Sequence, residues 1–226
     1  MQHQNLHLID FARDAAHYVL ERGREAIAAR GIFRLSLAGG NTPRAIYAAM
    51  AEAGLNFPWA KIQITFSDER CVAPHDKDSN FRMAQESLLT VAPIPGGNVF
   101  RVRGEIDPEE AALEYEAKLA SVAARFEEER YAHDLLLLGL GPDGHTASLF
   151  PGSPALLEAR RNVIPATGPK PPPQRITFTF PLINAAREVA FLVAEDSKKQ
   201  VVAEVQAGDP RHPASLVKPA TWLLGY

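Results

Sequence analysis

One histidine in the sequence stands in a setting suited to proton transfer, within the stretch LLLLGLGPDGHTASLF (135–150). His145 follows a run of leucines and lies among glycines at positions 139, 141 and 144. A histidine side chain gains or loses a proton near neutral pH, and Asp143 is close enough along the chain to orient the ring. A helix-capping turn with the histidine in solvent is the alternative, but three glycines after an apolar strand favour a general base.

The stretch AGGNTPR (38–44) has the features of an anion-binding turn. Its glycines allow the backbone to approach a ligand, and a helix starting at Thr42 would direct free N–H groups and its positive dipole end to the same place. The stretch matches neither the dinucleotide fingerprint GxGxxG nor the phosphate loop GxxxxGK[ST]. It therefore either holds a phosphate or makes only a tight strand-to-helix turn.

Charged residues follow the next predicted strand, in the segment SDERC (67–71). Arg70 could clamp a phosphate or carboxylate with two hydrogen bonds, and Asp68 could orient a sugar hydroxyl or act as a base. A solvated charged loop is the alternative for such a segment. Three later cations could close over an anionic substrate or be ordinary surface charges: Lys170, Arg175 and Lys198.

Several other kinds of chemistry lack the residues that they need. The sequence has neither HExxH nor paired CxxC, and its histidines are scattered, so no metal site is expected. It has no GxSxG elbow, which argues against a serine hydrolase. The one cysteine, Cys71, stands beside apolar Val72 and Ala73, so we expect a small buried residue rather than a nucleophile.

The elements that must position these residues alternate between strands and helices. Apolar strands are predicted at 32–38, 61–68, 133–141, 175–180, 188–194 and 221–226, and helices at 42–54, 78–89, 107–129 and 197–208. Thr42 is a good N-cap residue for the first of these helices, with Pro43 at its first position. The continuous apolar run at 133–141 is typical of a central strand covered on both faces.

This alternation predicts an α/β fold with a single doubly wound, mostly parallel Rossmann-like sheet and helices on both faces. In open parallel sheets the ligand binds outside the carboxyl ends of the strands. That rule selects four segments, which are 39–44, 67–71, 139–150 and 194–199. The candidate residues named above, apart from Lys170 and Arg175, fall in these segments.

Composition indicates a globular protein with a small-molecule ligand. The 226 residues are 46% hydrophobic and 23% charged, which fits one α/β domain over residues 1–226. The net charge of −3 suggests neither a nucleic-acid nor a membrane-surface partner, and no apolar run approaches the length of a membrane span. One cysteine and no secretory-signal pattern predict a cytoplasmic location, and we expect a monomer.

Four segments together resemble a known family, the 6-phosphogluconolactonases. In chain order they are LAGGNTPRAIY, FSDERCVAPHDKDSNFRMAQESLL, LLLLGLGPDGHTASLFPGSP and PKPPPQRITFTFPLINAAREVAFLVA, between about residue 30 and about residue 205. The resemblance implies a Rossmann-like domain related to the glucosamine-6-phosphate isomerases and deaminases. It also implies hydrolysis of 6-phospho-D-glucono-1,5-lactone to 6-phosphogluconate in the oxidative pentose phosphate pathway, without a metal or organic cofactor.

The resemblance also assigns roles to particular residues. It implies that His145 is the general base that activates water, and that Asp143 helps to orient it. It places four residues around the substrate phosphate, namely Gly39, Gly40, Asn41 and Thr42. It gives cationic contacts to Arg70 and to Lys170 or Arg175, and leaves open which of them binds the phosphate.

The family pattern differs from this sequence before the last long helix. Relatives often carry a glycine-containing turn before the lysine that opens this helix, whereas this chain has AEDSKK (194–199). Asp196 would bring negative charge near a phosphate, which argues against a phosphate-binding role for Lys198.

Two alternative functions remain. Glucosamine-6-phosphate deaminases resemble the Asp-Gly-His segment, but they usually carry a glutamate five residues after the histidine, where this chain has Phe150. They also tend to have Asp-Glu-Tyr where this chain has Asp-Glu-Arg at 68–70. A non-catalytic sugar-phosphate sensor would need an output module, and the first 30 or so residues predict only one amphipathic helix.

Overall fold

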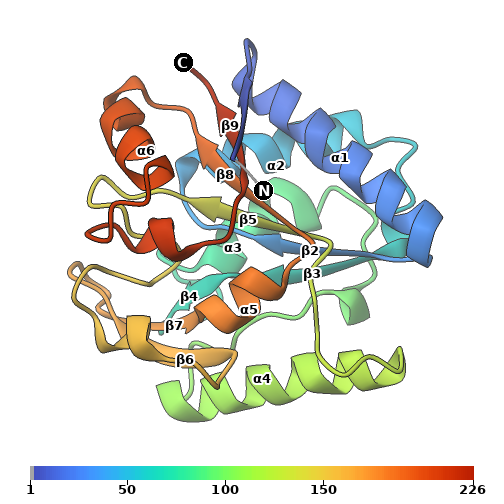
Figure 1. The fold of residues 1–226 in the computed structure, drawn as a ribbon. Helices are drawn as coiled ribbons and strands as arrows, with labels where there is room; N and C mark the ends of the chain where they lie inside the picture. Colours follow the sequence, from blue (N-terminus) through green and yellow to red (C-terminus); the bar gives the residue numbers. More distant parts are fainter. Residues whose placement is uncertain (1–2) are drawn as a thin grey trace.

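Six parallel strands form the main sheet of the computed structural model, which describes residues 3–226 (Figure 1). Their spatial order is β1-β9-β8-β5-β2-β3. They are β1 (Gln4–His7), β2 (Phe33–Leu37), β3 (Ile62–Phe66), β5 (Leu135–Gly139), β8 (Glu188–Val193) and β9 (Thr221–Leu224). A second, antiparallel sheet has the order β4-β7-β6 and consists of β4 (Asp68–Arg70), β7 (Gln174–Phe178) and β6 (Val163–Thr167).

Helices cover both faces of the main sheet (Figure 1). They are α1 (Phe11–Arg30), α2 (Asn41–Ala53), α3 (Asn80–Ala84), α4 (Pro108–Arg125), α5 (Phe180–Ala185) and α6 (Lys199–Gln206). The first three contribute to one apolar cluster, and the last three contribute to the other together with β6 and β7. None of the helices in the described part of the chain has the length and hydropathy that a membrane span requires.

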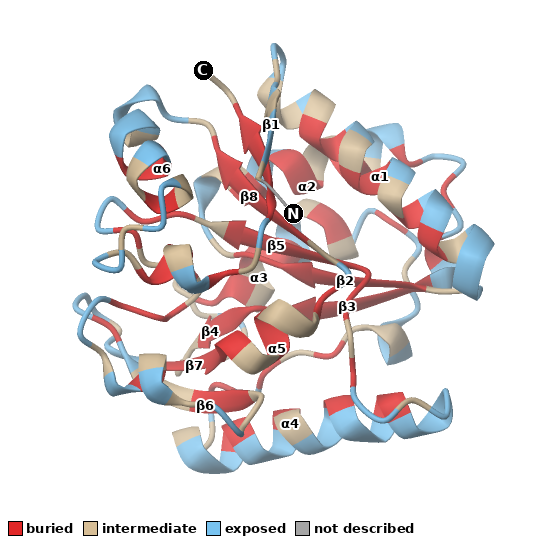
Figure 2. Cartoon of the chain, viewed as in Figure 1, coloured by how far each residue is buried: buried red, intermediate tan, exposed pale blue. Residues whose placement is uncertain are grey.

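The central strand β5 contributes to both apolar clusters. Successive side chains of a strand point to opposite faces, so Leu135 and Leu137 pack under α1 and α2, while Leu136 and Leu138 pack on the opposite side. All four side chains are fully buried, and Figure 2 shows β5 in red along most of its length. The predicted central strand covered on both faces is therefore confirmed, and with it the predicted α/β fold.

The sequence predicted a single sheet, whereas the structure has two. The apolar segment at 175–180 was expected as one more strand of a single sheet, but β7 pairs antiparallel with β4 and with β6. Alternation of apolar residues identifies a strand without identifying its partner, because the same pattern suits either sheet. The short strand β4 continues directly beyond β3, so Asp68 and Arg70 lie in a strand rather than in a solvated loop.

The beginning of α2 also differs from the prediction. Gly40, rather than Thr42, is the N-cap residue, and no side chain caps the helix. Gly40 has φ +111°, a conformation that L-residues other than glycine rarely adopt. Thr42 lies within the first turn, so the N–H groups at this end are not satisfied by a capping side chain. By contrast, the predicted cap of α4 is confirmed, because Asp107 accepts hydrogen bonds from the N–H groups of Glu109 and Glu110.

The order of strands reverses between β2 and β5. From β2 the chain moves outward to β3, and from β5 it moves the opposite way to β8 and β9. Loops that leave neighbouring strands in opposite directions open a crevice at the carboxyl edge of the sheet. The loops after β2 and β5 carry the anion-binding turn and His145, so the topology brings these two segments together.

Candidate active site

A cavity of about 530 Å³ lies at the carboxyl edge of the main sheet, between the loops after β2, β3, β5 and β8. This volume is in the range of pockets that bind small molecules. All of the site residues predicted from the sequence line it: Gly39, Gly40, Asn41, Thr42, Asp68, Arg70, Asp143, His145, Lys170 and Arg175. The structure therefore brings these residues together from segments far apart in the chain.

His145 is oriented by Asp143 within the loop that follows β5. The Asp143 Oδ1 atom lies 2.5 Å from His145 Nδ1 and also accepts a hydrogen bond from the His145 backbone N–H. Burial by itself would raise the pKa of the Asp143 carboxyl, but the hydrogen bond and the charge of His145 lower it below its ordinary value. A carboxylate on Nδ1 fixes the ring tautomer with its proton on this nitrogen and leaves Nε2 free to accept one.

The loop is closed tightly under the His145 ring. The N–H of Gly141 donates to the His145 carbonyl at 2.8 Å, which folds the turn back on itself. A Cβ atom on Gly141 would lie 2.0 Å from His145 Nδ1, so only glycine leaves room for the ring in this position. The glycine at 141 is therefore a steric requirement of the Asp143–His145 pair.

Phe150 and Ala147 complete the surroundings of His145. The centre of the Phe150 ring lies 4.5 Å from the centre of the His145 ring, and Phe150 also lines the cavity. Ala147 has φ +48°, an uncommon conformation for a residue other than glycine. The structure buries most of Phe150 and places its ring against the histidine ring at the edge of the cavity.

The turn before α2 approaches the cavity with its backbone. A Cβ atom on Gly39 would lie 2.0 Å from Asn80 Oδ1, so this glycine allows β2 and the start of α3 to come together. Because Gly40 caps α2 without a side chain, free N–H groups and the positive end of the helix dipole face the same region. This arrangement can bind an anion such as a phosphate.

Asp68 is buried and links the strand segment to the histidine loop. Its Oδ2 atom accepts a hydrogen bond of 2.7 Å from Ser148 Oγ, and its Oδ1 atom accepts one of 3.2 Å from Asn80 Nδ2. Both carboxylate oxygens therefore have protein partners, although the residue still lines the cavity. Asp68 connects three of the loops that form the cavity.

The neighbouring Glu69 holds the start of α3. Its carboxylate is almost fully buried and accepts hydrogen bonds from the N–H groups of Asn80 and Phe81 and from Ser79 Oγ. Burial raises the pKa of this carboxyl, although the backbone hydrogen bonds act in the opposite direction. Glu69 thus positions Asn80, which lines the cavity, without being among the lining residues itself.

Two arginines face each other across neighbouring strands. Arg70 on β4 and Arg175 on β7 are direct partners in the antiparallel register. Burial and then the charge of Arg70 lower the pKa of Arg175, as expected for two adjacent cations. Within residues 3–226 neither guanidinium lies within salt-bridge distance of a carboxylate. An anion in the cavity would relieve the repulsion between them.

Lys198 differs from these arginines because its charge is already paired. Lys198 Nζ lies 3.0 Å from Glu195 Oε2, and Thr42 Oγ1 donates a hydrogen bond of 3.5 Å to Glu195 Oε1. Both Glu195 and Lys198 line the cavity. The sequence suggested that Asp196 would bring negative charge here, but Asp196 pairs with Lys199, and Glu195 is the carboxylate at the cavity.

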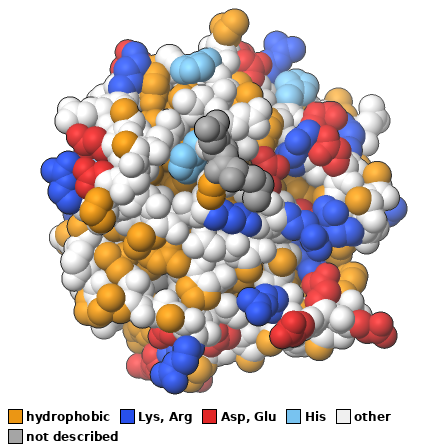
Figure 3. Space-filling model, viewed as in Figure 1, with side chains coloured by type: hydrophobic (Ala, Val, Ile, Leu, Met, Phe, Trp, Pro, Cys, Tyr) orange, Lys and Arg blue, Asp and Glu red, His pale blue; other side chains and the backbone are white. Residues whose placement is uncertain are grey.

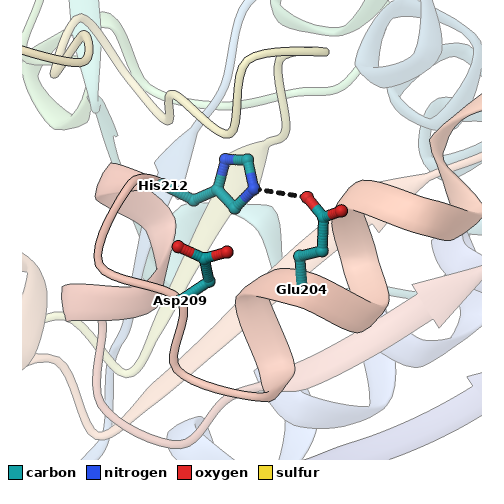
Figure 4. A group of neighbouring side chains, drawn as sticks. All are labelled: Glu204, Asp209 and His212. Carbon is teal, nitrogen blue, oxygen red and sulfur yellow. Dashed lines mark hydrogen bonds and ion pairs between the residues drawn. The ribbon is translucent and has the colours of Figure 1, made fainter.

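A group of three side chains next to the histidine loop has the ligand types of a metal site. The ligand atoms of Glu204, Asp209 and His212 lie within 4.8 Å of one another (Figure 4). His212 Nε2 already contacts Glu204 Oε2 at 2.7 Å, and Asp209 is engaged by Arg211. These contacts form an ion-paired cluster, in which both ring nitrogens of His212 face protein oxygens.

Some cavity residues, such as Asn80 and Glu195, were not identified from the sequence. The only sequence signal for these residues is their position at the start of a helical segment, because Asn80 begins α3 and Glu195 stands between the end of β8 and the turn at Asp196–Lys198. The burial predicted for Cys71 also differs from the structure. Cys71 is half-buried rather than buried, and burial followed by the charge of Glu69 raises the pKa of its thiol to about 11. A thiol with this pKa is a poor nucleophile at neutral pH.

The surface seen in Figure 3 fits a protein with a small-molecule ligand. Basic and acidic side chains are interspersed on this face rather than gathered into one basic area. Hydrophobic side chains, a class that includes proline in this view, gather at the lower left, where Figure 1 shows β6 and β7. The charge distribution of this face gives no support to nucleic-acid binding.

Known proteins resemble this chain along most of its length. The family model described as glucosamine-6-phosphate isomerases/6-phosphogluconolactonase matches residues 8–224. The 6-phosphogluconolactonase of Synechocystis sp. is 44% identical over 213 residues, which are 91% of this chain and 87% of the relative. The crystal structure of 6-phosphogluconolactonase from Thermotoga maritima has a TM-score of 0.88 at 29% identity and covers 100% of both chains. That of the Trypanosoma brucei enzyme has a TM-score of 0.86 at 28% identity and covers 99% of this chain and 96% of its own.

Proposed function

Because this chain belongs to the family of glucosamine-6-phosphate isomerases and 6-phosphogluconolactonases, we propose that its cavity hydrolyses 6-phospho-D-glucono-1,5-lactone with His145 as the general base. The chain is a hydrolase of the 6-phosphogluconolactonase class, which acts in the pentose phosphate pathway. The proposal concerns how its residues carry out this hydrolysis. The observation that carries it is the Asp143–His145 pair, which shares one cavity with the uncapped start of α2.

In the proposed reaction His145 Nε2 takes a proton from a water molecule as the water oxygen attacks the lactone carbonyl carbon. The bond between this carbon and the ring oxygen then breaks, and the protonated His145 returns the proton to the ring oxygen. Asp143 accepts a hydrogen bond from Nδ1–H and stabilises the positive charge that the ring gains. A lactone is an activated ester, so water attacks it directly and no covalent enzyme intermediate or metal ion is needed.

The phosphate supplies binding energy at a distance from the reacting carbon. We assign it to the turn of Gly39, Gly40, Asn41 and Thr42, because the start of α2 offers N–H groups that no side chain caps. Arg70 and Arg175 line the same cavity and have no carboxylate partner, so their charge is available to the anionic substrate. Lys170 lines the cavity from the loop before β7 and is assigned the same type of contact.

The alternative activity, deamination of glucosamine 6-phosphate, is disfavoured by Phe150. The phenylalanine ring packs against His145 at the position where the deaminases usually carry a proton-transferring glutamate. A phenyl ring has no proton to exchange, so ring opening by that route has no acid or base here.

The substrate assay separates these activities. The purified protein should accelerate acid release from freshly made 6-phosphogluconolactone far above the spontaneous rate, and should release no ammonia from glucosamine 6-phosphate. A rate equal to the spontaneous one would refute the proposed function, and ammonia release would favour the deaminase.

We also propose that the enzyme works as a monomer in the cytoplasm. The residues to which we assign the reaction and the phosphate meet in one cavity within a single copy of the chain, so the proposed reaction needs no residue from a second copy. Sedimentation at working concentration tests the monomer directly, since a stable dimer would be seen at twice the mass.

A further inference from the structure

We propose that His212 is a positioning residue, which holds the loop of Asp143 and His145 in the geometry that activates water. The inference rests on the proposed function, because it concerns the same histidine pair. His212 does not line the cavity, and it belongs to the segment that follows α6. It contacts the histidine loop from outside the cavity lining.

The first contact is a hydrogen bond to the backbone of the loop. His212 Nδ1 lies 3.1 Å from the carbonyl oxygen of Asp143, and the N–H of Ala214 donates to the carbonyl of Gly144 at 2.9 Å. Two successive carbonyls of the loop are therefore held by one short segment. Asp143 in turn binds both the backbone N–H and the Nδ1 of His145, so a displacement of residue 143 moves the ring directly.

The second contact is steric. Gly144 has φ +76°, and its Cα packs against the His212 ring so closely that a Cβ atom there would lie 2.3 Å from Nδ1. The ring thus fills the space that the glycine leaves, and the left-handed turn brings His145 back over Gly141. Removal of the imidazole would leave a gap directly behind the loop.

Both ring nitrogens of His212 face acceptors. A backbone carbonyl can only accept a hydrogen bond, and the ionised Glu204 carboxylate can only accept one as well. Both contacts are satisfied together only when both nitrogens carry protons, as in the imidazolium ion. Figure 4 shows the ring beside Glu204 and Asp209, whose charges stabilise this form.

The charged groups around His212 agree with this protonation state. They are Glu204 on α6, Asp209 and Arg211 in the following turn, and Asp143 in the histidine loop. Burial alone would lower the pKa of His212, but the Asp143 carbonyl and the carboxylates of Glu204 and Asp209 raise it above its ordinary value. The imidazolium is therefore favoured over the neutral ring as the form that binds the loop, and the contact weakens as pH rises through this pKa.

The main test compares His212→Ala with His212→Asn. The alanine variant loses the donor to Asp143, and we expect kcat to fall on the order of tenfold or more with little change in KM, since misplacement of a base affects the chemical step. The asparagine amide can donate from nearly the same position as Nδ1, so His212→Asn should recover most of kcat. Equal loss in both folded variants would overturn the proposal, as would an effect confined to KM.

A second variant tests the protonation of His212 without removing its imidazole ring. Glu204→Gln replaces an acceptor with an amide that can donate to Nε2, so a neutral ring with its proton on Nδ1 keeps its hydrogen bond to Asp143. As pH rises through the pKa of His212, the kcat of the wild type should decline, and the kcat of this variant should lack that decline. The matched control is Glu21→Gln on α1, which neutralises an exposed glutamate paired with Arg24, far along the chain from the loop. A pH profile of kcat for Glu204→Gln that matches the wild type and the control would contradict the proposal.

A spectroscopic measurement makes the result independent of turnover. The ring ¹⁵N shifts of His145 report which nitrogen carries the proton, and His212→Ala should convert one tautomer into a mixture. Unchanged His145 shifts in a folded His212→Ala protein would overturn the positioning role even if the protein proved inactive on the lactone.

Discussion

At the scale of single residues, the site depends on a short contact that residue types alone could only suggest. The stretch GPDGHTAS contains an aspartate and a histidine two positions apart, and the structure joins Asp143 Oδ1 to His145 Nδ1 at 2.5 Å. The contact requires a turn that folds back, which Gly141 permits by lacking a Cβ atom. The proposed base is therefore defined by a pair of side chains and by the glycine that makes room for them.

Replacement of His145 by alanine should remove most of the turnover. A general base contributes roughly 10²–10⁴-fold to a rate, and it acts mainly in the transition state, so kcat should fall strongly while KM changes little. Steady-state kinetics on fresh lactone check this, with exposed His75→Ala as the control that should keep full activity. If turnover survives in His145→Ala, another group is the base, and Asp68 is the first to examine.

Replacement of Arg70 by alanine should weaken the binding of phosphorylated ligands. Arg70 faces Arg175 without a carboxylate partner, so its charge can attract an anion, and a hydrogen bond to a charged group contributes about 1.5–3 kcal/mol. Calorimetric titration with 6-phosphogluconate should show at least a tenfold weaker affinity. Lys199→Ala serves as the control, since Lys199 pairs with Asp196 outside the cavity. Unchanged affinity for 6-phosphogluconate would remove Arg70 from the phosphate site.

At the scale of elements, the turn between β2 and α2 must approach α3 without side chains in the way. Gly39 has Asn80 against it, and Glu69 fixes Asn80 through backbone hydrogen bonds. The start of α2 and the start of α3 thus share one wall of the cavity. A substitution at this contact should therefore change both the stability of the fold and the binding of the substrate.

Replacement of Gly39 by alanine should reduce stability and substrate binding together. The new Cβ atom would stand 2.0 Å from Asn80 Oδ1, and such overpacking costs about 1–3 kcal/mol. Urea denaturation and the KM for the lactone measure the two effects. Gly97→Ala is the matched control, because a Cβ atom there meets nothing within 4 Å, and it should leave both values unchanged. A wild-type KM in Gly39→Ala would show that the turn does not contact the substrate.

At the scale of the whole molecule, the two apolar clusters share the central strand, and a buried histidine precedes this strand. His133 has no exposed surface, and its Nε2 lies 2.8 Å from Thr65 Oγ1. Burial, followed by the charge of Arg34, lowers the pKa of His133 from 6.5 to about 3. The native protein therefore keeps this ring neutral at pH values where the unfolded chain takes up a proton.

The stability of the protein should fall as the solution is acidified from neutral pH. Between pH 6.5 and 3 the unfolded state binds one more proton at His133 than the native state, so stability rises with pH by about 1.4 kcal/mol per unit from this group. From pH 7 to pH 5 the loss from His133 is about 2 kcal/mol. Urea denaturation at the two pH values should show this loss in the free energy of unfolding, and His133→Gln should show a smaller loss between the same pH values. An equal difference in the variant would refute the assignment to His133.

The sequence by itself determined the class of fold, and it predicted ten of the residues that line the cavity. The apolar run of β5, the caps of α4 and the polar residues after each strand are local patterns, so their physical causes act within a few residues. The rule that ligands bind at the carboxyl ends of parallel strands then selected the segments that line the cavity, because this edge is common to all strands of such a sheet.

Only the tertiary structure decided which segments meet. Strand alternation does not specify a partner, so the second sheet and the register that sets Arg70 opposite Arg175 could not be deduced. Nor could the cap at Gly40, the Phe150 ring against His145, or the contact of His212 with the Asp143 carbonyl, 69 residues away in sequence. Such contacts depend on packing between distant segments, and a local pattern of residue types carries no information about distance in the folded chain.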